Sequence, residues 1–146
     1  GMLENFQWIG KPRAAPGPGE IEIAILASGL NFRDVMLAMG LLNDDVLDYG
    51  MAGAVYGFEC AGRVLSVGEG VVEHRPGDLV FGFGKESFAT HVTGPAQSFV
   101  TLPEGMRPEA GAAIPVAFYT AWYSLVEMAR LAPGEKVLIH GGAGSV

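Results

Sequence analysis

Basic residues are scarce in this sequence. Nine Lys and Arg residues stand against 16 Asp and Glu residues, which gives a formal net charge of −7 at pH 7. Nucleic-acid binding depends on Lys and Arg side chains that gather on one surface and neutralise phosphates. The nine basic residues are scattered along the chain, so the sequence argues against a nucleic-acid partner.

Cysteine and long apolar runs are also lacking. The single cysteine, Cys60, cannot form an internal disulfide, which fits a reducing compartment. No apolar run approaches the roughly 18 to 20 residues that a membrane-spanning helix needs. The N-terminus does not show the charged and then apolar segments of a secretion signal. We therefore expect a cytoplasmic protein with no membrane partner.

Glycine and proline, in contrast, are abundant. The chain has 22 Gly and 9 Pro, only 17% charged residues, and 49% apolar residues, enough for one buried core. This composition is typical of β domains with many short turns. From Glu20 onwards, isoleucine at every second position (Ile21, Ile23 and Ile25) predicts a strand with one buried face.

A short helix is expected after this strand. Asn31 is a suitable N-terminal cap for it, and Gly40 suits its C-terminal end. Residues 43–53 are interpreted as an acidic loop. Further on, short β-prone runs alternate with Gly and Pro turns, which indicates a compact barrel or sandwich. These runs are residues 63–67, 78–83, 88–92 and 98–101.

The pattern changes near Pro108, which suits the first turn of a helix. Apolar residues then continue at helical spacing as far as Ala129. Residues 136–140 form an apolar run that predicts a buried strand. The expected organisation is an N-terminal segment and linker (1–19), a β domain (20–107) and the start of a further domain (108–146), within which the sequence stops.

The most specific motif starts at Gly57-Phe58-Glu59 and continues with glycines, valines and a Gly77-Asp78 pair over about 24 positions. It resembles the signature of medium-chain alcohol dehydrogenases, in which Gly-His-Glu precedes the same spacing. In physical terms the glycines permit tight turns and the valines face a core. The resemblance implies the GroES-like barrel of medium-chain reductases, a mainly β fold with short helices.

Metal binding is not expected. The resemblance places Phe58, which has no donor atom, where those dehydrogenases have a zinc-binding histidine. The other candidates, Cys60, His74, His91 and His140, show no ligand spacing among them. Each histidine is interpreted as a surface or hydrogen-bonded residue, and the cysteine as a small buried hydrophobic residue.

A second motif, residues 27–40, resembles the strand-to-helix corner of zinc-free quinone oxidoreductases. It resembles the enoyl reductase domains of type I polyketide synthases more closely still. In those families the corner lines the cleft where nicotinamide and substrate meet, which implies that Asn31 and Asp34 bind cofactor and that Phe32 lines the substrate site. The alternative is that Asn31 is only a helix cap and Asp34 a favourable charge in the first turn.

The C-terminal segments extend the resemblance. Residues 113–125 resemble the entry to the helix that links the two domains of these reductases, which implies a cofactor contact from Thr120; a bond to its own helix is the alternative. The run 136–140 is then the first strand of a truncated Rossmann domain, followed by a glycine turn that approaches a pyrophosphate. The expected cofactor-binding residues of this turn are Gly141, Gly142, Ala143, Gly144, Ser145 and Val146.

The resemblance covers effectively the whole chain, from Leu3 onwards. It implies that the complete domain transfers a hydride from NADPH to the β-carbon of an α,β-unsaturated acyl thioester, in polyketide or fatty acid synthesis. The implied partners are an acyl carrier protein that carries the thioester and the neighbouring synthase domains. The catalytic proton donor is expected beyond Val146. The 146 residues alone are expected to be inactive, and their uncovered apolar strand to favour self-association.

Two other functions stay open. A free-standing NADPH-dependent quinone or enone oxidoreductase of the same superfamily would act on a small molecule without a carrier protein. A non-catalytic barrel module would serve as a scaffold or interaction surface. Residues 3–8 and the corner at residues 31–34 favour the synthase reductase over the free-standing enzyme.

Overall fold

The computed structural model describes residues 3–49 and 53–144. Its centre is an antiparallel sheet with the strand order β4-β1-β2-β3-β5. The strands are β1 (Glu20–Ser28), β2 (Glu59–Val67), β3 (Leu79–Phe83), β4 (His91–Pro95) and β5 (Phe99–Thr101). The α-helices are α1 (Phe32–Met39), α2 (Asp44–Tyr49), α3 (Pro108–Ala112) and α4 (Pro115–Trp122), and the other helical turns are η1 (Leu3–Asn5), η2 (Ala96–Ser98) and η3 (Tyr123–Met128). The expected mainly β fold with short helices is confirmed.

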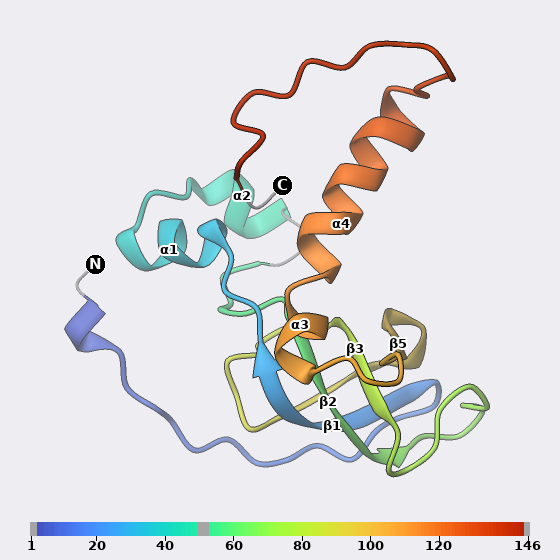
Figure 1. The fold of residues 1–146 in the computed structure, drawn as a ribbon. Coiled ribbons are helices and arrows are strands. Elements are labelled where there is room, and N and C mark those ends of the chain that lie inside the picture. The colour runs from blue at the N-terminus through green and yellow to red at the C-terminus, as the bar shows by residue number, and fades with distance from the viewer. Residues whose placement is uncertain (1–2, 50–52, 145–146) are drawn as a thin grey trace.

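Figure 1 shows how these elements are arranged. The sheet occupies one part of the molecule, α1 and α2 lie beyond the end of β1, and α4 extends away from the sheet. α3 packs against β1, β2 and β3. α1, which directly follows β1, and α3, which packs against β1, therefore come from distant parts of the sequence.

β1 organises the core. It pairs with β2 on one side and with β4 on the other. Ile21 and Ile23 are fully buried, as the alternating pattern predicts. Apolar side chains from the neighbouring strands and from η2 pack on them to exclude water. The buried cluster consists of Ile21, Ile23, Cys60, Val64, Val80, Val92, Ala96 and Phe99.

The opposite face of β1 is not simply polar and exposed, because Glu22 is buried there. Its Oε1 accepts a hydrogen bond from Arg13 Nε at 2.7 Å, and its Oε2 accepts one from Ser66 Oγ at 3.0 Å. Arg13 belongs to the expected linker, so this segment is tied to the sheet. The hydrogen bond from Arg13 lowers the pKa of the Glu22 carboxyl below its usual value, although burial opposes the shift.

The lowered pKa makes the contribution of Glu22 to stability depend on pH. Its charged form is favoured in the native state, so it stabilises the fold above the ordinary pKa of about 4.3, and this stabilisation is lost as the pH falls through the native value. We expect Glu22→Gln to lower the free energy of unfolding, measured with urea, more at neutral pH than in acid. The control is Glu69→Gln, at an exposed side chain. An equal effect of Glu22→Gln at both pH values contradicts this expectation.

The helix expected after β1 is confirmed as α1. Asn31 stands at its N-terminal cap, and Gly40 ends it in the left-handed conformation, with a φ of 70°. The loop expected over residues 43–53 is wrong in part, because α2 lies within it. Asn43 Oδ1 accepts a hydrogen bond from the N–H of Val46 at 3.0 Å and so caps this helix, whose first turn is acidic.

The strand expected over residues 136–140 is not formed. Residues 135–139 have no regular structure, and the side chains of Val137, Leu138 and Ile139 are exposed. A parallel strand needs neighbouring strands to pair its N–H and C=O groups. The strands that the structure describes all belong to the one antiparallel sheet and leave this run without a partner. A smaller difference is that β4 begins at His91, three residues after the start of the expected run.

Candidate reductase corner

Asn31 lies at the corner where the chain leaves β1 and enters α1. Its side-chain Nδ2 donates a hydrogen bond to Oε1 of Glu59 at 2.9 Å. Because Glu59 is only 3% exposed, this bond holds the Asn31 amide against a fixed partner. Asn31 therefore occupies the cap position of α1 and at the same time presents an oriented amide at the corner.

Asp34 closes the corner from within α1 and is 2% exposed. Its Oδ2 accepts a hydrogen bond from the backbone N–H of Asn31, and its Oδ1 accepts one from the N–H of Gly57, both at 2.9 Å. Both carboxylate oxygens are thus used inside the protein. Asp34 therefore joins α1 to the segment before β2.

Glu59 belongs to the motif that starts at Gly57, but it was not among the expected site residues. Besides Asn31, it accepts a hydrogen bond from the backbone N–H of Val116 at 2.8 Å, through Oε2. Val116 lies in the first turn of α4, and Ile114 at the cap position of this helix makes no side-chain cap. Glu59 therefore caps α4 from a distant part of the chain. The signal in the sequence was a carboxylate between Phe58 and Cys60, at the start of a buried strand.

Thr120 lies one turn beyond Val116 on α4, so Glu59 connects the helix that carries Thr120 with Asn31. The Thr120 hydroxyl donates a hydrogen bond to the backbone oxygen of Val116 at 2.7 Å, and its side chain is exposed. This is the bond to its own helix that was the structural alternative. Its oxygen can still accept a hydrogen bond from a ligand.

Two aromatic side chains flank the corner. Phe32 is 75% exposed at the start of α1. The ring of Phe58 is covered by Arg33, whose guanidinium carbon lies 4.6 Å from the ring centroid. Arg33 also donates hydrogen bonds to the backbone oxygens of Val55 and Gly53. Phe58, which stands where the resemblance places a zinc-binding histidine, is thus packed under the guanidinium group of Arg33.

The family model of the alcohol dehydrogenase GroES-like domain matches residues 17–106, more than half of the chain. The chain belongs to this family. The pikromycin polyketide synthase component PikAII of Streptomyces venezuelae is 42% identical over 130 residues, which are 89% of this chain and 3% of that protein. The GroES-like chain thus spans a small part of this curated relative.

Solved structures are similar to this chain as well. The CurK enoyl reductase matches 99% of this chain and 45% of its own chain, with a TM-score of 0.90 and 38% identity. A mycobacterial protein solved in complex with NADPH matches 93% of this chain and 41% of its own, with a TM-score of 0.76 and 30% identity. The GroES-like chain spans less than half the length of both. The expected resemblance to polyketide synthase enoyl reductases and to medium-chain reductases is confirmed.

The expected pyrophosphate turn of this GroES-like chain is exposed. Gly141 has a φ of 69°, and its backbone oxygen accepts a hydrogen bond from the N–H of Gly144 at 2.7 Å. Gly142 and Ala143 lie in this turn, between the two residues that this hydrogen bond joins. Ser145 and Val146 lie outside the described residues. The turn is therefore formed locally, without the strand and helix that support a phosphate site.

Within residues 3–49 and 53–144, no group of three or more His, Cys, Asp or Glu residues is placed to hold a metal ion. His74 is buried and lies within hydrogen-bond distance of the backbone oxygens of Ala96 and Phe99. His91 contacts Thr90 Oγ1.

In the same part of the chain, no helix has the length and apolar character needed to cross a membrane.

Cys60 is expected to be chemically inert. It is fully buried in the core, and burial, reinforced by the charge of Glu59, raises the pKa of its thiol to about 12. Because the thiolate is the nucleophile, iodoacetamide at about pH 8 should leave Cys60 unmodified in the native protein and alkylate it after denaturation. Peptide mass mapping measures this difference. Rapid alkylation of Cys60 in the native protein contradicts it.

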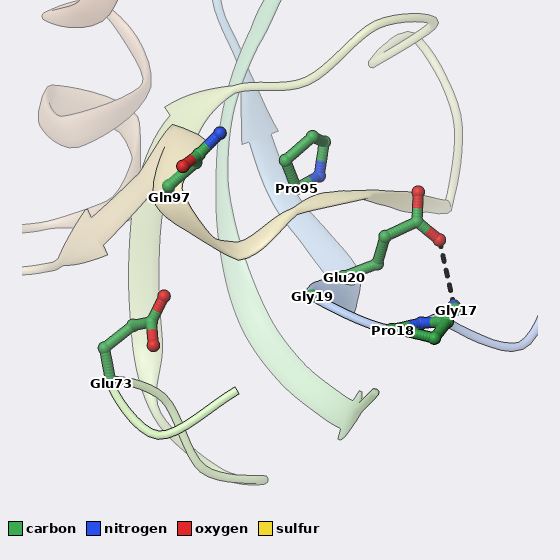
Figure 2. Close-up of a pocket in the computed structure, with 7 residues that line it drawn as sticks. All are labelled: Gly17, Pro18, Gly19, Glu20, Glu73, Pro95 and Gln97. Carbon is green, nitrogen blue, oxygen red and sulfur yellow. Dashed lines mark hydrogen bonds between the residues drawn. The ribbon is translucent and has the colours of Figure 1, made fainter. Parts of the chain in front are cut away.

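A shallow hollow of about 550 Å³ lies at the opposite end of β1 (Figure 2). In Figure 2 a hydrogen bond of 2.9 Å joins the N–H of Gly17 to Oε2 of Glu20 beside it. Because Glu20 begins β1 and Ser28 ends it, the hollow is about 25 Å from the corner. Its lining residues are Gly17, Pro18, Gly19, Glu20, Glu73, Pro95 and Gln97. It includes none of the expected site residues.

Proposed function

We propose that the complete protein is an enoyl reductase of a polyketide synthase, which uses NADPH to reduce an α,β-unsaturated acyl thioester. The observation that carries this proposal is the match between 99% of this chain and the CurK enoyl reductase, with a TM-score of 0.90. The similarity to a polyketide synthase supports it from sequence. In this proposal residues 20–107 form the substrate half, and residues 108–146 form the linking helix and the beginning of the nucleotide half.

The corner suits the nicotinamide end of the cofactor. Only one of the two amide hydrogens of Asn31 is used by Glu59, which leaves the other for a ligand. The first turn of α4 lies beside it, bonded to the same carboxylate. The pyrophosphate end needs a strand and a helix around the glycine turn at residues 141–144, and these are not among the described elements.

NADPH supplies the hydride when it is bound. The residues of this chain would bind the cofactor and the substrate and orient them. Asn31 would hold the nicotinamide through its amide, and Thr120 would contact the same end of the cofactor through its hydroxyl oxygen. The exposed ring of Phe32 would contact the acyl chain of the substrate. Fixing both reactants in one geometry removes much of the entropy cost of the reaction.

The proposed partners follow from this assignment. An acyl carrier protein would deliver the thioester, and the neighbouring synthase domains would lie on either side of the reductase. The similarity of the chain to 3% of a polyketide synthase component is consistent with such a setting. The proton donor to the α-carbon is proposed to lie beyond residue 146.

The test is an assay of the full-length protein with crotonyl thioesters and with small quinones, following NADPH or NADH oxidation by absorbance. We expect the thioester with NADPH to give a kcat/KM at least about tenfold above that of any quinone. A preference for the quinone would support the free-standing oxidoreductase instead. No oxidation of either nucleotide would support the non-catalytic barrel.

A further inference from the structure

Glu59 connects two parts of the molecule that come from distant regions of the sequence. Its Oε1 accepts the side-chain N–H of Asn31 at 2.9 Å, and its Oε2 accepts the backbone N–H of Val116 at 2.8 Å. Asn31 follows β1, whereas Val116 lies in α4, 57 residues beyond Glu59. One carboxylate thus joins the corner at the end of β1 to the first turn of α4.

This carboxylate is buried without a cation, which is costly unless hydrogen bonds stabilise it. Glu59 takes part in none of the ion pairs among the described residues. Those pairs are Lys11–Glu86, Arg13–Glu22 and Arg107–Glu109. The N-terminal end of α4 and the two N–H donors stabilise the charge instead. An apolar residue in this place would leave both donors without an acceptor.

Gly29 leaves the space that this carboxylate occupies. A Cβ atom at this position would lie 2.5 Å from Cγ and 2.6 Å from Cδ of Glu59, which is too close for any real contact. The N–H of Gly29 also donates to the backbone oxygen of Glu59 at 3.1 Å. The position of the Glu59 side chain therefore depends on the absence of a side chain at residue 29.

We propose that Glu59 is a positioning residue of the reductase. The N–H of Val116 anchors one carboxylate oxygen, and the other oxygen dictates which way the Asn31 amide is turned. A carboxylate can only accept hydrogen bonds, so Asn31 must direct its Nδ2 inwards and its Oδ1 away from Glu59. The inference rests on the proposed function, because only a bound cofactor gives the orientation of Asn31 a catalytic meaning.

The decisive variant is Glu59→Gln, which keeps the size of the side chain. The backbone N–H of Val116 can only donate and cannot turn, so the amide oxygen of the new Gln side chain should face it. The NH₂ group of the Gln then faces Asn31. The Asn31 amide is then expected to flip, so that Oδ1 accepts from Gln and Nδ2 points the other way. Both hydrogen bonds of residue 59 remain, and the flip alters only the capping contact between the Asn31 side chain and the N–H of Asp34, so the melting temperature should fall by no more than a few degrees. The kcat/KM for the thioester should fall about 10- to 100-fold, as for other residues that orient a binding group.

A double-mutant cycle separates positioning from a structural effect. In an Asn31→Ala background, Glu59→Gln should lower kcat/KM by less than about threefold, because no amide is left to orient. An equal loss in both backgrounds, or a loss matched by a large drop in melting temperature, overturns the proposal. Glu69→Gln is the control for removing a carboxylate at an exposed site.

A second readout needs neither cofactor nor activity. In the cofactor-free protein, the Asn31 Nδ2 proton signal in an NMR spectrum should lie downfield because the carboxylate accepts it, and Glu59→Gln should move it to the range of exposed amides. An unchanged signal overturns the proposal. If the wild-type protein reduces no enoyl thioester, the proposed function fails, and this signal still decides whether Glu59 orients Asn31.

Gly29→Ala tests the same claim without changing Glu59. The added methyl group should displace the carboxylate, remove the downfield Asn31 signal and lower kcat/KM at least about tenfold. Gly10→Ala is the matched control, because a Cβ at Gly10 meets no atom within 4 Å. Retention of both the signal and the activity in Gly29→Ala overturns the proposal.

Discussion

Replacing Ile23 with alanine is expected to lower the free energy of unfolding by about 3 to 4 kcal/mol. Ile23 is fully buried in the middle of β1, which pairs on both sides, so the cavity left by the lost methyl and methylene groups cannot collapse easily. Urea unfolding followed by circular dichroism measures the change.

The matched control is Leu26→Ala in the same strand, which removes as many carbon atoms. Leu26 is 54% exposed, so this change should cost below about 1 kcal/mol. Equal costs for the two variants would mean that the buried face of β1 is not the one that the structure shows.

The Asp34→Asn variant is expected to lose about 2 to 3 kcal/mol of the free energy of unfolding. Both oxygens of Asp34 accept backbone N–H groups, from Asn31 and from Gly57, in a site that is 2% exposed. The amide nitrogen of the variant must face one of these donors, and neither backbone group can turn. One buried N–H then has no acceptor, and the corner loosens.

Asp48→Asn in α2 serves as the control, because Asp48 is exposed. It should change the free energy of unfolding by less than about 0.5 kcal/mol. A similarly small change for Asp34→Asn would show that the carboxylate does not join α1 to the segment before β2.

Local features of the fold could be predicted from the sequence. The alternating isoleucines gave the buried face of β1, and Asn31 and Gly40 gave both ends of α1. These signals are contained in neighbouring residues, because the strand period and the helix caps act over a few positions. The position of the corner was predicted for the same reason, since it lies where these two local patterns meet.

Features that depend on distant contacts could not be predicted in this way. Glu59 meets Asn31 and Val116 only after the chain has folded, and neither partner is near it in sequence. The burial of Glu22 depends on Arg13 and on Ser66 of a neighbouring strand. The apolar run at residues 136–140 fails to form a strand for a related reason, because a strand is stabilised by partners outside itself.

A crystal structure of the full-length protein with bound NADPH tests most directly whether the corner at the end of β1 is the cofactor site. We expect the nicotinamide to lie against this corner, with the outward-facing group of Asn31 about 3 Å from a polar atom of the cofactor and Glu59 still bonded to Asn31 and Val116. A nicotinamide bound without contact to Asn31 or to the first turn of α4 would contradict this assignment.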